Sequence, residues 1–426
     1  MLRKFPQPRV ILGEDTRESS RWIAETVAAG LHEAGVIAYS VGVITTPGLA
    51  YLTVSEGFAA GVMISASHNP YQDNGIKVFD GSGYKLPDEE EMALERDIFM
   101  ALSRPSDGNP VPLLLQPDRA LIGSYVQYLR RAAAVSDWNL AGLKLVVDCA
   151  NGSAAAIAGE VFSGLGLQLH LIADQPDGRN INLRCGSLHL ENLREAVLRV
   201  SADLGVSFDG DADRALFVAA TGKFVDGDGI LLLASRYMRR KGTLKGDVVI
   251  GTVMANLGLE NALACEGLRL LRTPVGDKYV LEEMQRVGGN LGGEQSGHII
   301  FSELATTGDG LLTALQVLRI MAEEQRTLEQ LVEGLSVFPQ TIRNVRVRER
   351  VPLEGLPPVQ EQIRASQQCL GNSGRILVRY SGTELLVRVM VEAESAEQVE
   401  RHASALVRVI QESMGESIGA APLSSG

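Results

Sequence analysis

The sequence predicts an α/β protein with three similar mixed-sheet α/β domains, followed by a smaller α+β domain at the C-terminal end. Three observations lead to this fold class. The 426 residues exceed the length of one ordinary domain core. A pattern of apolar strand, loop and helix recurs three times, and an alternating apolar pattern follows in the last part of the chain.

The recurring pattern starts with three short apolar stretches, at residues 10–12, 145–147 and 248–250. Each stretch runs into a loop with polar or glycine residues and then into a segment that we expect to be largely helical. Their wide and similar spacing indicates three α/β units built on one plan. The alternative is coincidence, because apolar triplets before glycine are common.

The last part of the chain has a different pattern. Residues 376–378 and the alternating valines within 387–391 are typical of strands in a half-exposed sheet. A helix then begins at Ser395, with Gln398 at capping-box spacing. Its apolar stripe consists of Val399, Ala403, Leu406, Val407 and Ile410.

These patterns place the predicted domains at residues 1–135, 136–238, 239–339 and 340–415. The tail of residues 416–426 is rich in Ser, Gly, Ala and Pro, and we expect it to be disordered.

Composition and charge exclude several classes of protein. The formal net charge of -12, without any basic cluster, argues against a nucleic-acid partner but not against a small phosphorylated ligand. The four cysteines are far apart and form no Cys-x-x-Cys pair, so neither a zinc site nor a disulfide framework is indicated. No signal peptide or bilayer-spanning apolar run is found, and we expect a cytoplasmic protein without a membrane partner.

The first loop of chemical interest follows the apolar stretch 62–64. Small and turn-forming residues take over there, and Pro70 prevents a regular hydrogen-bond ladder. Ser67 and His68 are therefore expected on a loop at the rim of a sheet, where a hydroxyl can meet a ligand. An ordinary turn is the alternative. No Gly-x-Ser-x-Gly elbow surrounds Ser67, so a hydrolase triad is unsupported.

The second loop holds three carboxylates at alternate positions, Asp209, Asp211 and Asp213, separated by Gly and Ala. Unpaired, they would repel one another, so they are expected to converge on one hard cation such as magnesium. An EF-hand does not fit, because its sixth and twelfth positions would be Arg214 and Ala220. A solvated acidic turn is the alternative.

Two further loops offer groups that bind sugars and phosphates. In the glycine-rich stretch 292–298, Glu294 and Ser296 are suited to sugar hydroxyls, with a plain glycine turn as the alternative, whereas His298 is predicted to be a packed core histidine. In the stretch 379–384, an arginine, two hydroxyls and free amides around a glycine form a candidate phosphate cradle.

Together the four loops resemble the four active-site boxes of the α-D-phosphohexomutase family, in the right order and one in each domain. The matching stretches are Ser65 to Pro70, Asp209 to Arg214, Gly293 to His298 and Arg379 to Glu384. Shorter stretches near residues 74–77, 180–187, 275–279 and 307–310 agree with the resemblance. Within the family, the third and fourth boxes are most similar to those of phosphoglucosamine mutases.

The resemblance implies four domains around a central cleft and a phosphotransferase mechanism. Ser67 would be a phosphoserine, with Mg²⁺ held by Asp209, Asp211, Asp213 and an oxygen of the Ser67 phosphate. The phosphoryl group would move to glucosamine 6-phosphate and return from a 1,6-bisphosphate, and a catalytic sugar 1,6-bisphosphate would prime the enzyme. The product, glucosamine 1-phosphate, would feed UDP-N-acetylglucosamine synthesis.

The resemblance also assigns the remaining site residues. Glu294 and Ser296 would hold the ring hydroxyls of the sugar. His68, Lys77 and Arg214 join the catalytic group, His68 and Lys77 as candidates for proton transfer. The phosphate that is not reacting would be held by Arg379, Ser381, Gly382 and Thr383.

The family also has an N-terminal Gly-Thr-Asp-Gly-Ile-Arg-Gly box, which has no counterpart before Val10 in this sequence. We expect an in-frame upstream stretch to encode it and the chain as written to be slow. A phosphomannomutase/phosphoglucomutase and a non-catalytic sugar-phosphate-binding paralogue stay open as alternatives, and so does a homodimer.

Overall fold

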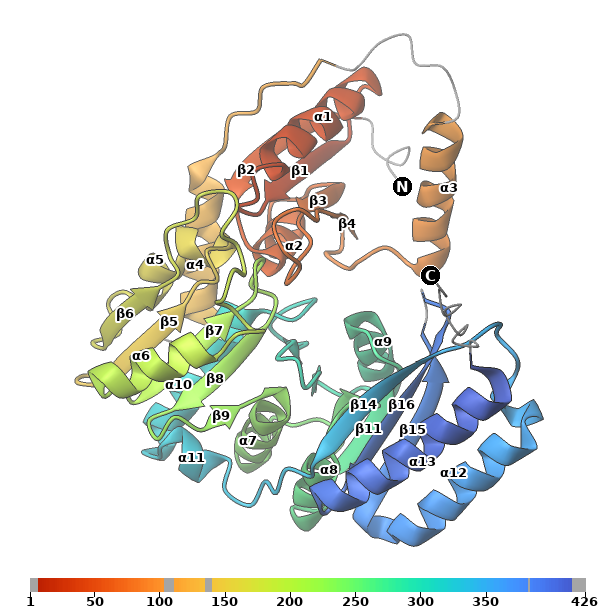
Figure 1. Ribbon diagram of the computed structural model, residues 1–426. Helices are drawn as coiled ribbons and strands as arrows, with labels where there is room; N and C mark the ends of the chain where they lie inside the picture. Colours follow the sequence, from red (N-terminus) through yellow and green to blue (C-terminus); the bar gives the residue numbers. More distant parts are fainter. Residues whose placement is uncertain (1–6, 103–110, 135–139, 382–383, 416–426) are drawn as a thin grey trace, which may run out of the picture. The chain divides into compact units, whose positions relative to one another are not determined.

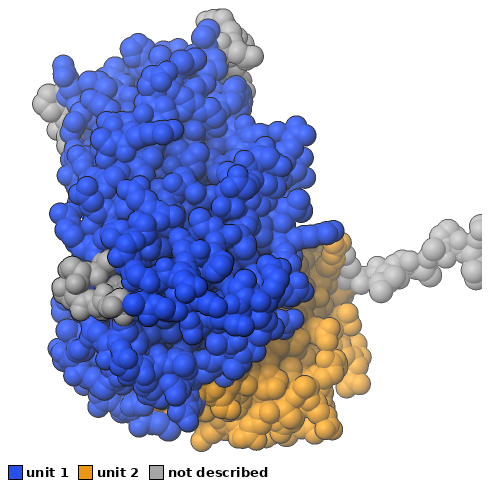
Figure 2. Space-filling model, turned by 90° about the vertical axis from the view of Figure 1, so that its left-hand side faces the viewer, with its two compact units in different colours: residues 1–255, 263–334 blue, residues 256–262, 335–426 orange. Residues whose placement is uncertain are grey.

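The computed structural model describes residues 7–102, 111–134, 140–381 and 384–415 (Figure 1). The chain forms two compact units, one of residues 1–255 and 263–334 and the other of residues 256–262 and 335–426 (Figure 2). The predicted domain boundaries and the central cleft stay predictions, and the tail predicted to be disordered lies outside the described residues. No described helix has the length and apolar character needed to cross a bilayer.

Three sheets in the first unit share one plan, which confirms the predicted repeat. Their strand orders are β2-β1-β3-β4, β6-β5-β7-β8-β9 and β11-β10-β12-β13. In each sheet the first strand of the repeat is central and pairs in parallel with the second and third strands. The fourth strand then pairs antiparallel with the third.

The bounds of the elements follow this plan. The first repeat contains β1 (Arg9–Glu14), α1 (Ser20–Glu33), β2 (Ile37–Val43), α2 (Thr46–Ser55), β3 (Ala60–Ile64), β4 (Ile76–Asp80) and α3 (Asp88–Leu102), and α4 (Arg119–Ala132) follows it. The second repeat contains β5 (Lys144–Asp148), the 3-10 helix η3 (Ser153–Ala156), α5 (Ala158–Phe162), β6 (Gln168–Ile172), α6 (Glu191–Val200), β7 (Leu204–Phe208), β8 (Ala215–Ala219), β9 (Phe224–Val225) and α7 (Gly227–Arg240). The third contains β10 (Val248–Thr252), α8 (Leu257–Cys265), β11 (Arg269–Thr273), α9 (Asp277–Val287), β12 (Leu291–Gly293), β13 (Ile299–Phe301), α10 (Gly310–Glu324) and α11 (Leu328–Leu331).

The equivalent loop of each repeat carries one of the predicted functional loops. The loop between the third and fourth strands holds Ser67 in the first repeat, the three aspartates in the second and Glu294 in the third. These loops leave the sheets at the ends of fully buried strands, because β3, β7 and β12 contain no exposed residue. The repeated topology therefore brings three different loops to corresponding positions.

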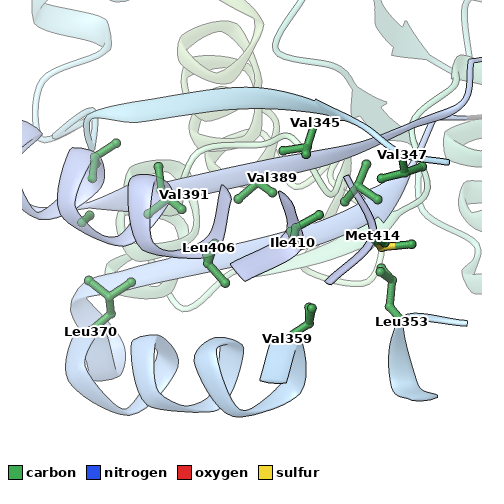
Figure 3. Packing of buried hydrophobic residues seen from close by; sticks show 14 residues of the cluster. Val345, Val347, Leu353, Val359, Leu370, Val389, Val391, Leu406, Ile410 and Met414 are labelled. Carbon is green, nitrogen blue, oxygen red and sulfur yellow. The ribbon is translucent and has the colours of Figure 1, made fainter. Parts of the chain in front are cut away.

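The second unit is the predicted α+β domain. Its antiparallel sheet has the order β14-β16-β15, with β14 (Gln340–Arg346), β15 (Gly374–Tyr380) and β16 (Leu386–Ala393). Figure 3 shows the core between this sheet and the helices α12 (Pro357–Leu370) and α13 (Ala396–Met414), with Val389 and Val391 facing Leu406. As predicted, the Ser395 hydroxyl caps α13 by accepting the Gln398 N–H.

Candidate active site

The loop after β3 holds Ser67 in a backbone conformation that is unusual for a residue with a side chain. Its φ is +50°, in the left-handed region, which costs on the order of 1 kcal/mol or more. The conformation directs the Ser67 Oγ to the second repeat, where it lies 2.5 Å from Asp209 Oδ2. The Nδ1 atom of His68 lies 3.2 Å from the same hydroxyl oxygen.

Two planar side chains hold this loop, and the sequence analysis assigned no role to either. Arg17 is fully buried, pairs with Asp15 and donates from Nη2 to the carbonyls of Ser67 and Asn69, each at 2.9 Å. Asn182, from the second repeat, donates from Nδ2 to the same two carbonyls at 2.9 and 3.0 Å. The strained conformation of Ser67 is thus fixed from both repeats.

The three aspartates of the second loop converge as predicted. Suitable oxygens of Asp209, Asp211 and Asp213 all lie within 4.8 Å of one another, and the three side chains are buried. Burial, reinforced by the charges of Asp213 and Asp211, raises the pKa of Asp209 well above its usual value. Such crowding of carboxylates is unfavourable unless positive charge lies close to them.

The residues fit a hard divalent cation. Asp211 Oδ1 and Asp213 Oδ1 are buried oxygens without a hydrogen-bond partner among the described residues. Orphaned carboxylate oxygens beside Asp209 are the hard ligands that magnesium prefers, and three protein ligands leave positions for oxygens of a phosphate.

Cationic side chains surround the triad. Lys77, on β4, places its Nζ 2.6 Å from Asp211 Oδ2 and 3.5 Å from Asp213 Oδ2. Burial alone would lower the pKa of Lys77, but the two carboxylates reverse the effect and raise it, so the ammonium stays charged. Arg214 donates its backbone N–H to Asp209 and has a buried Nε without a hydrogen-bond partner among the described residues.

Amide groups at three helix N-termini fix the backbone of residues 209–214, the loop of the three aspartates, which we call the metal loop. Ser153 N, at the start of η3, donates to the Gly210 carbonyl at 2.8 Å. Thr46 N, at the start of α2, donates to the Asp211 carbonyl at 3.0 Å. Gly310 N, at the start of α10, donates to the Ala212 carbonyl, also at 3.0 Å. Three consecutive carbonyls are thereby held by elements from all three repeats.

The third loop contacts the second directly. The Ala215 N–H, next to Arg214, donates to the Gly297 carbonyl at 3.0 Å. Glu294 accepts the Gly276 N–H at 3.1 Å through Oε1 and the Ser296 hydroxyl at 3.3 Å through Oε2. The Glu294 carboxylate is therefore fixed in place beside the Ser296 hydroxyl. This is the arrangement expected of a group that binds sugar hydroxyls.

His298 is buried, as predicted, but it is also linked to the metal loop. Its Nδ1 lies 3.6 Å from Asp213 and its Nε2 lies 3.5 Å from Asp277. Burial lowers the pKa of His298, but the two carboxylates outweigh this effect and raise it. The Nε2 atom also accepts the Gly308 N–H at 2.9 Å, an arrangement of the neutral ring, and this geometry favours a neutral His298 with Nδ1–H facing Asp213.

The fourth loop lies in the second unit and is described by itself. Arg379 on β15 stands directly opposite Arg388 on β16, and burial followed by the Arg388 charge lowers the pKa of Arg379. Arg388 donates to the Ser381 hydroxyl at 3.4 Å, and Arg350 donates to the Ser381 carbonyl at 2.8 Å. The predicted Gly382 and Thr383 lie outside the described residues.

Two arginines directly opposite each other are destabilising in a sheet, and here the Glu384 carboxylate, 3.7 Å from Arg388, offsets part of the repulsion. The face that carries Arg379 and Arg388 points away from the core, because the neighbouring Val387 and Val389 are fully buried. The phosphate cradle at this loop stays a prediction, and Arg388 lies beside two of the residues predicted for it, Arg379 and Ser381. A polar residue between core valines was the available signal in the sequence.

The structure thus brings nine predicted site residues together in the first unit: Ser67, His68, Lys77, Asp209, Asp211, Asp213, Arg214, Glu294 and Ser296. Their individual roles stay predictions. Arg17 and Asn182 lie in polar stretches that the sequence made visible, but their contacts to the Ser67 loop depend on the fold.

A half-buried serine hydroxyl beside convergent carboxylates and fixed cations is the arrangement expected of a metal-dependent phosphoryl-transfer enzyme. Comparison with known proteins gives the family. Phosphoglucomutase/phosphomannomutase alpha/beta/alpha domains I, II and III match residues 1–104, 123–222 and 226–338, and the C-terminal domain matches residues 343–409. The chain belongs to the α-D-phosphohexomutase family of enzymes.

Relatives and solved structures agree with this assignment. The chain is 51% identical to a phosphoglucosamine mutase of Solibacter usitatus, over 96% of this chain and 91% of the relative. It is 49% identical to one of Koribacter versatilis, over 97% and 90%. A phosphoglucomutase/phosphomannomutase family protein of Burkholderia thailandensis has the same fold, with a TM-score of 0.77, 24% identity and coverage of 99% and 92%. Aspergillus fumigatus N-acetylphosphoglucosamine mutase, solved with GlcNAc-6P and magnesium, matches with a TM-score of 0.64, 22% identity and coverage of 86% and 92%.

Proposed function

We propose that the chain is a phosphoglucosamine mutase, which interconverts glucosamine 6-phosphate and glucosamine 1-phosphate through a phosphoserine and a bound 1,6-bisphosphate. The observation that carries the proposal is the Ser67 hydroxyl, 2.5 Å from Asp209 at the acidic triad. The choice of glucosamine rests on the relatives of that name, such as the one 51% identical to this chain.

Ser67 carries the phosphoryl group. The P–O bond to Ser67 Oγ breaks while a new bond forms to O1 of glucosamine 6-phosphate, and the hydroxyl proton of the sugar ends on Ser67. The reoriented bisphosphate then returns its 6-phosphoryl group to Ser67 by the same exchange. A catalytic amount of sugar 1,6-bisphosphate primes chains in which Ser67 is unphosphorylated.

Asp209, Asp211, Asp213 and a phosphoserine oxygen would hold magnesium. When bound, the ion supplies positive charge that neutralises the phosphoryl oxygens in the transition state. Lys77 and Arg214 provide further fixed charge at the same place, which is the main requirement of phosphoryl transfer.

His68 is better placed than Lys77 to move the proton. Its Nδ1 lies 3.2 Å from Ser67 Oγ, within reach of the atom that gains or loses the proton. Burial and the nearby Arg214 lower the pKa of His68, so the ring is neutral near pH 7 and able to accept a proton. The raised pKa of Lys77 assigns it an electrostatic role.

Glu294 and Ser296 hold ring hydroxyls, and the loop of Arg379, Ser381, Gly382 and Thr383, together with Arg388, holds the phosphate that is not reacting. Because the two phosphates of the bisphosphate exchange places, each of these groups must accept the sugar in two orientations.

A coupled mutase assay tests the proposal. Glucosamine 6-phosphate, magnesium and catalytic glucosamine 1,6-bisphosphate are supplied, and formation of glucosamine 1-phosphate is followed. Turnover that is lost in Ser67→Ala is the expected result. Bisphosphate binding without turnover would identify a sugar-phosphate-binding paralogue instead.

We further propose that the protein is cytoplasmic and that a small sugar phosphate is its partner. A homodimer stays a prediction, to be checked by light scattering of the purified chain.

A further inference from the structure

A buried tyrosine that belongs to none of the four functional loops bonds to two residues that lie next to contacts of the metal loop. Tyr125, on α4, is fully buried, and its phenol donates to Asp309 Oδ2 at 2.8 Å. The same phenol oxygen accepts a hydrogen bond from the Thr45 hydroxyl at 3.4 Å. A single oxygen thus joins two residues that are 264 positions apart along the chain (309 minus 45).

Both partners are helix N-caps. The Thr45 hydroxyl accepts the Gly48 N–H and caps α2, and the Asp309 carboxylate accepts the Leu312 N–H and caps α10. The next residue of each helix reaches the metal loop: Thr46 donates its N–H to the Asp211 carbonyl, and Gly310 donates to the Ala212 carbonyl. Thr46 also donates its hydroxyl to the Asp211 carboxylate.

The starts of α2 and α10 pack so closely against their neighbours that they leave no room for a side chain at two glycine positions. A Cβ at position 48 would lie 2.8 Å from the Tyr125 ring, so the first turn of α2 sits directly on that ring. A Cβ at position 310 would lie 2.5 Å from the Arg214 carbonyl and 2.9 Å from the Ala212 carbonyl. Such distances are shorter than ordinary contacts, and the two glycines allow the helix starts to come this near.

We propose that Tyr125 is a positioning residue for the metal loop: its phenol joins the caps of α2 and α10 and thereby keeps the carboxylate of Asp211 in the geometry that binds magnesium. The inference rests on the proposed metal role of the three aspartates. It adds a residue that touches neither the metal nor the sugar.

The variant Tyr125→Phe removes the phenol and keeps the shape of the ring. A matched control is Tyr128→Phe, because Tyr128 lies on the same helix and donates its phenol to the Leu304 carbonyl but to no cap. Magnesium binding to the purified full-length chain, without sugar phosphate, is measured by calorimetry. We expect Tyr125→Phe to bind magnesium roughly threefold to tenfold more weakly, the factor of one buried hydrogen bond, and Tyr128→Phe to bind as the wild type does.

A second variant breaks the same hydrogen bond from the other side, so that the test still holds if Tyr125→Phe misfolds. Asp309→Ser retains a hydroxyl that caps α10, but the shorter side chain does not reach Tyr125. It should weaken magnesium binding to a similar extent, and the double variant should lose no more than either single variant, because both break one link.

The outcomes separate this inference from the proposed function. Unchanged magnesium affinity in Tyr125→Phe, or equal loss in Tyr128→Phe, would overturn the positioning role alone. A wild-type chain that bound no magnesium would overturn the proposed metal site and this inference together.

Discussion

At the scale of single residues, the acidic triad makes the sharpest prediction. Asp211 has a buried carboxylate oxygen without a hydrogen-bond partner among the described residues. Replacing Asp211 by Asn removes the negative charge of this candidate magnesium ligand and should reduce turnover at limiting magnesium by roughly a hundredfold or more. The fold should persist, because one repulsive charge among three is lost. Turnover is measured against magnesium concentration, with Asp247→Asn, a change at an exposed position, as the control. Full activity of Asp211→Asn at limiting magnesium would show that the metal loop is wrongly assigned.

Asn182 makes a second prediction at this scale. In Asn182→Asp the side chain keeps its shape but loses the amide that donates to the Ser67 and Asn69 carbonyls. We expect kcat to fall about tenfold to a hundredfold, since misplacement of a nucleophile is costly, while the KM for sugar phosphate changes little. Steady-state kinetics of this variant are compared with those of Asn192→Asp, because Asn192 donates to the Arg184 carbonyl and not to the Ser67 loop. A loss confined to KM would contradict the role of Asn182.

The residues found from the sequence and those missed differ in one physical respect. Ser67 and the three aspartates lie in short stretches whose composition alone predicts a loop with a functional role. Asn182 reaches Ser67 across 115 positions, and Tyr125 reaches Asp309 across 184. Such contacts exist only after separate sheets have packed, so no local sequence pattern predicts them.

At the scale of elements, the cap of α10 predicts a dependence of stability on pH. Burial raises the pKa of Asp309 from 3.8 to about 6, although the Leu312 N–H and Tyr125 oppose the effect. Because the folded-state value is the higher one, the protonated form contributes stability below about pH 4, and this contribution is lost as pH rises through about 6. The free energy of unfolding of wild type relative to Asp309→Asn should fall by about 2–3 kcal/mol across this range.

Denaturant titrations of both proteins at several pH values measure the difference, in which contributions of other titrating groups cancel. Asn keeps the cap and a hydrogen bond to Tyr125, so it isolates the charge. A constant difference between pH 4 and 7 would contradict the burial argument for Asp309.

The strands β15 and β16 carry a prediction for the fourth loop. Arg388→Ala removes one of two opposed arginines, so stability should change by less than about 1 kcal/mol, whereas the KM for glucosamine 6-phosphate should rise roughly tenfold to a hundredfold. Arg343→Ala, on β14 and paired with Glu400 at the surface, is the control. If thermal melting and kinetics of the two variants proved alike, Arg388 would have no part in phosphate binding.

At the scale of the whole molecule, the preferred hexose distinguishes the proposed enzyme from its nearest alternative. Glucosamine 6-phosphate should exceed mannose 6-phosphate in kcat/KM by about tenfold or more, because discrimination reflects differential binding of the transition state. Both substrates are compared in one coupled assay with their matching bisphosphates. Equal or reversed preference would favour a phosphomannomutase/phosphoglucomutase.

The general architecture was accessible from the sequence because its cause is local. Apolar triplets at Val10, Leu145 and Val248 became the central strands of three sheets, and the alternating valines of β16 became the core of the second unit. The strand orders, and the meeting of three helix starts at Gly210, Asp211 and Ala212, arise from packing between distant segments and had no counterpart in the pattern.

The equivalent loops of the three repeats have a consequence for how such an enzyme can evolve. Duplication of one α/β unit yields three copies of a strand–loop–strand position, and each copy can then diverge separately. In the proposed mechanism, one copy holds the nucleophile, the next holds the cation ligands and the third holds the sugar contacts. If these roles hold, selection can alter the hexose accepted through changes around Glu294, on its own sheet, while the loops of Ser67 and Asp209 retain the chemistry inherited by every descendant.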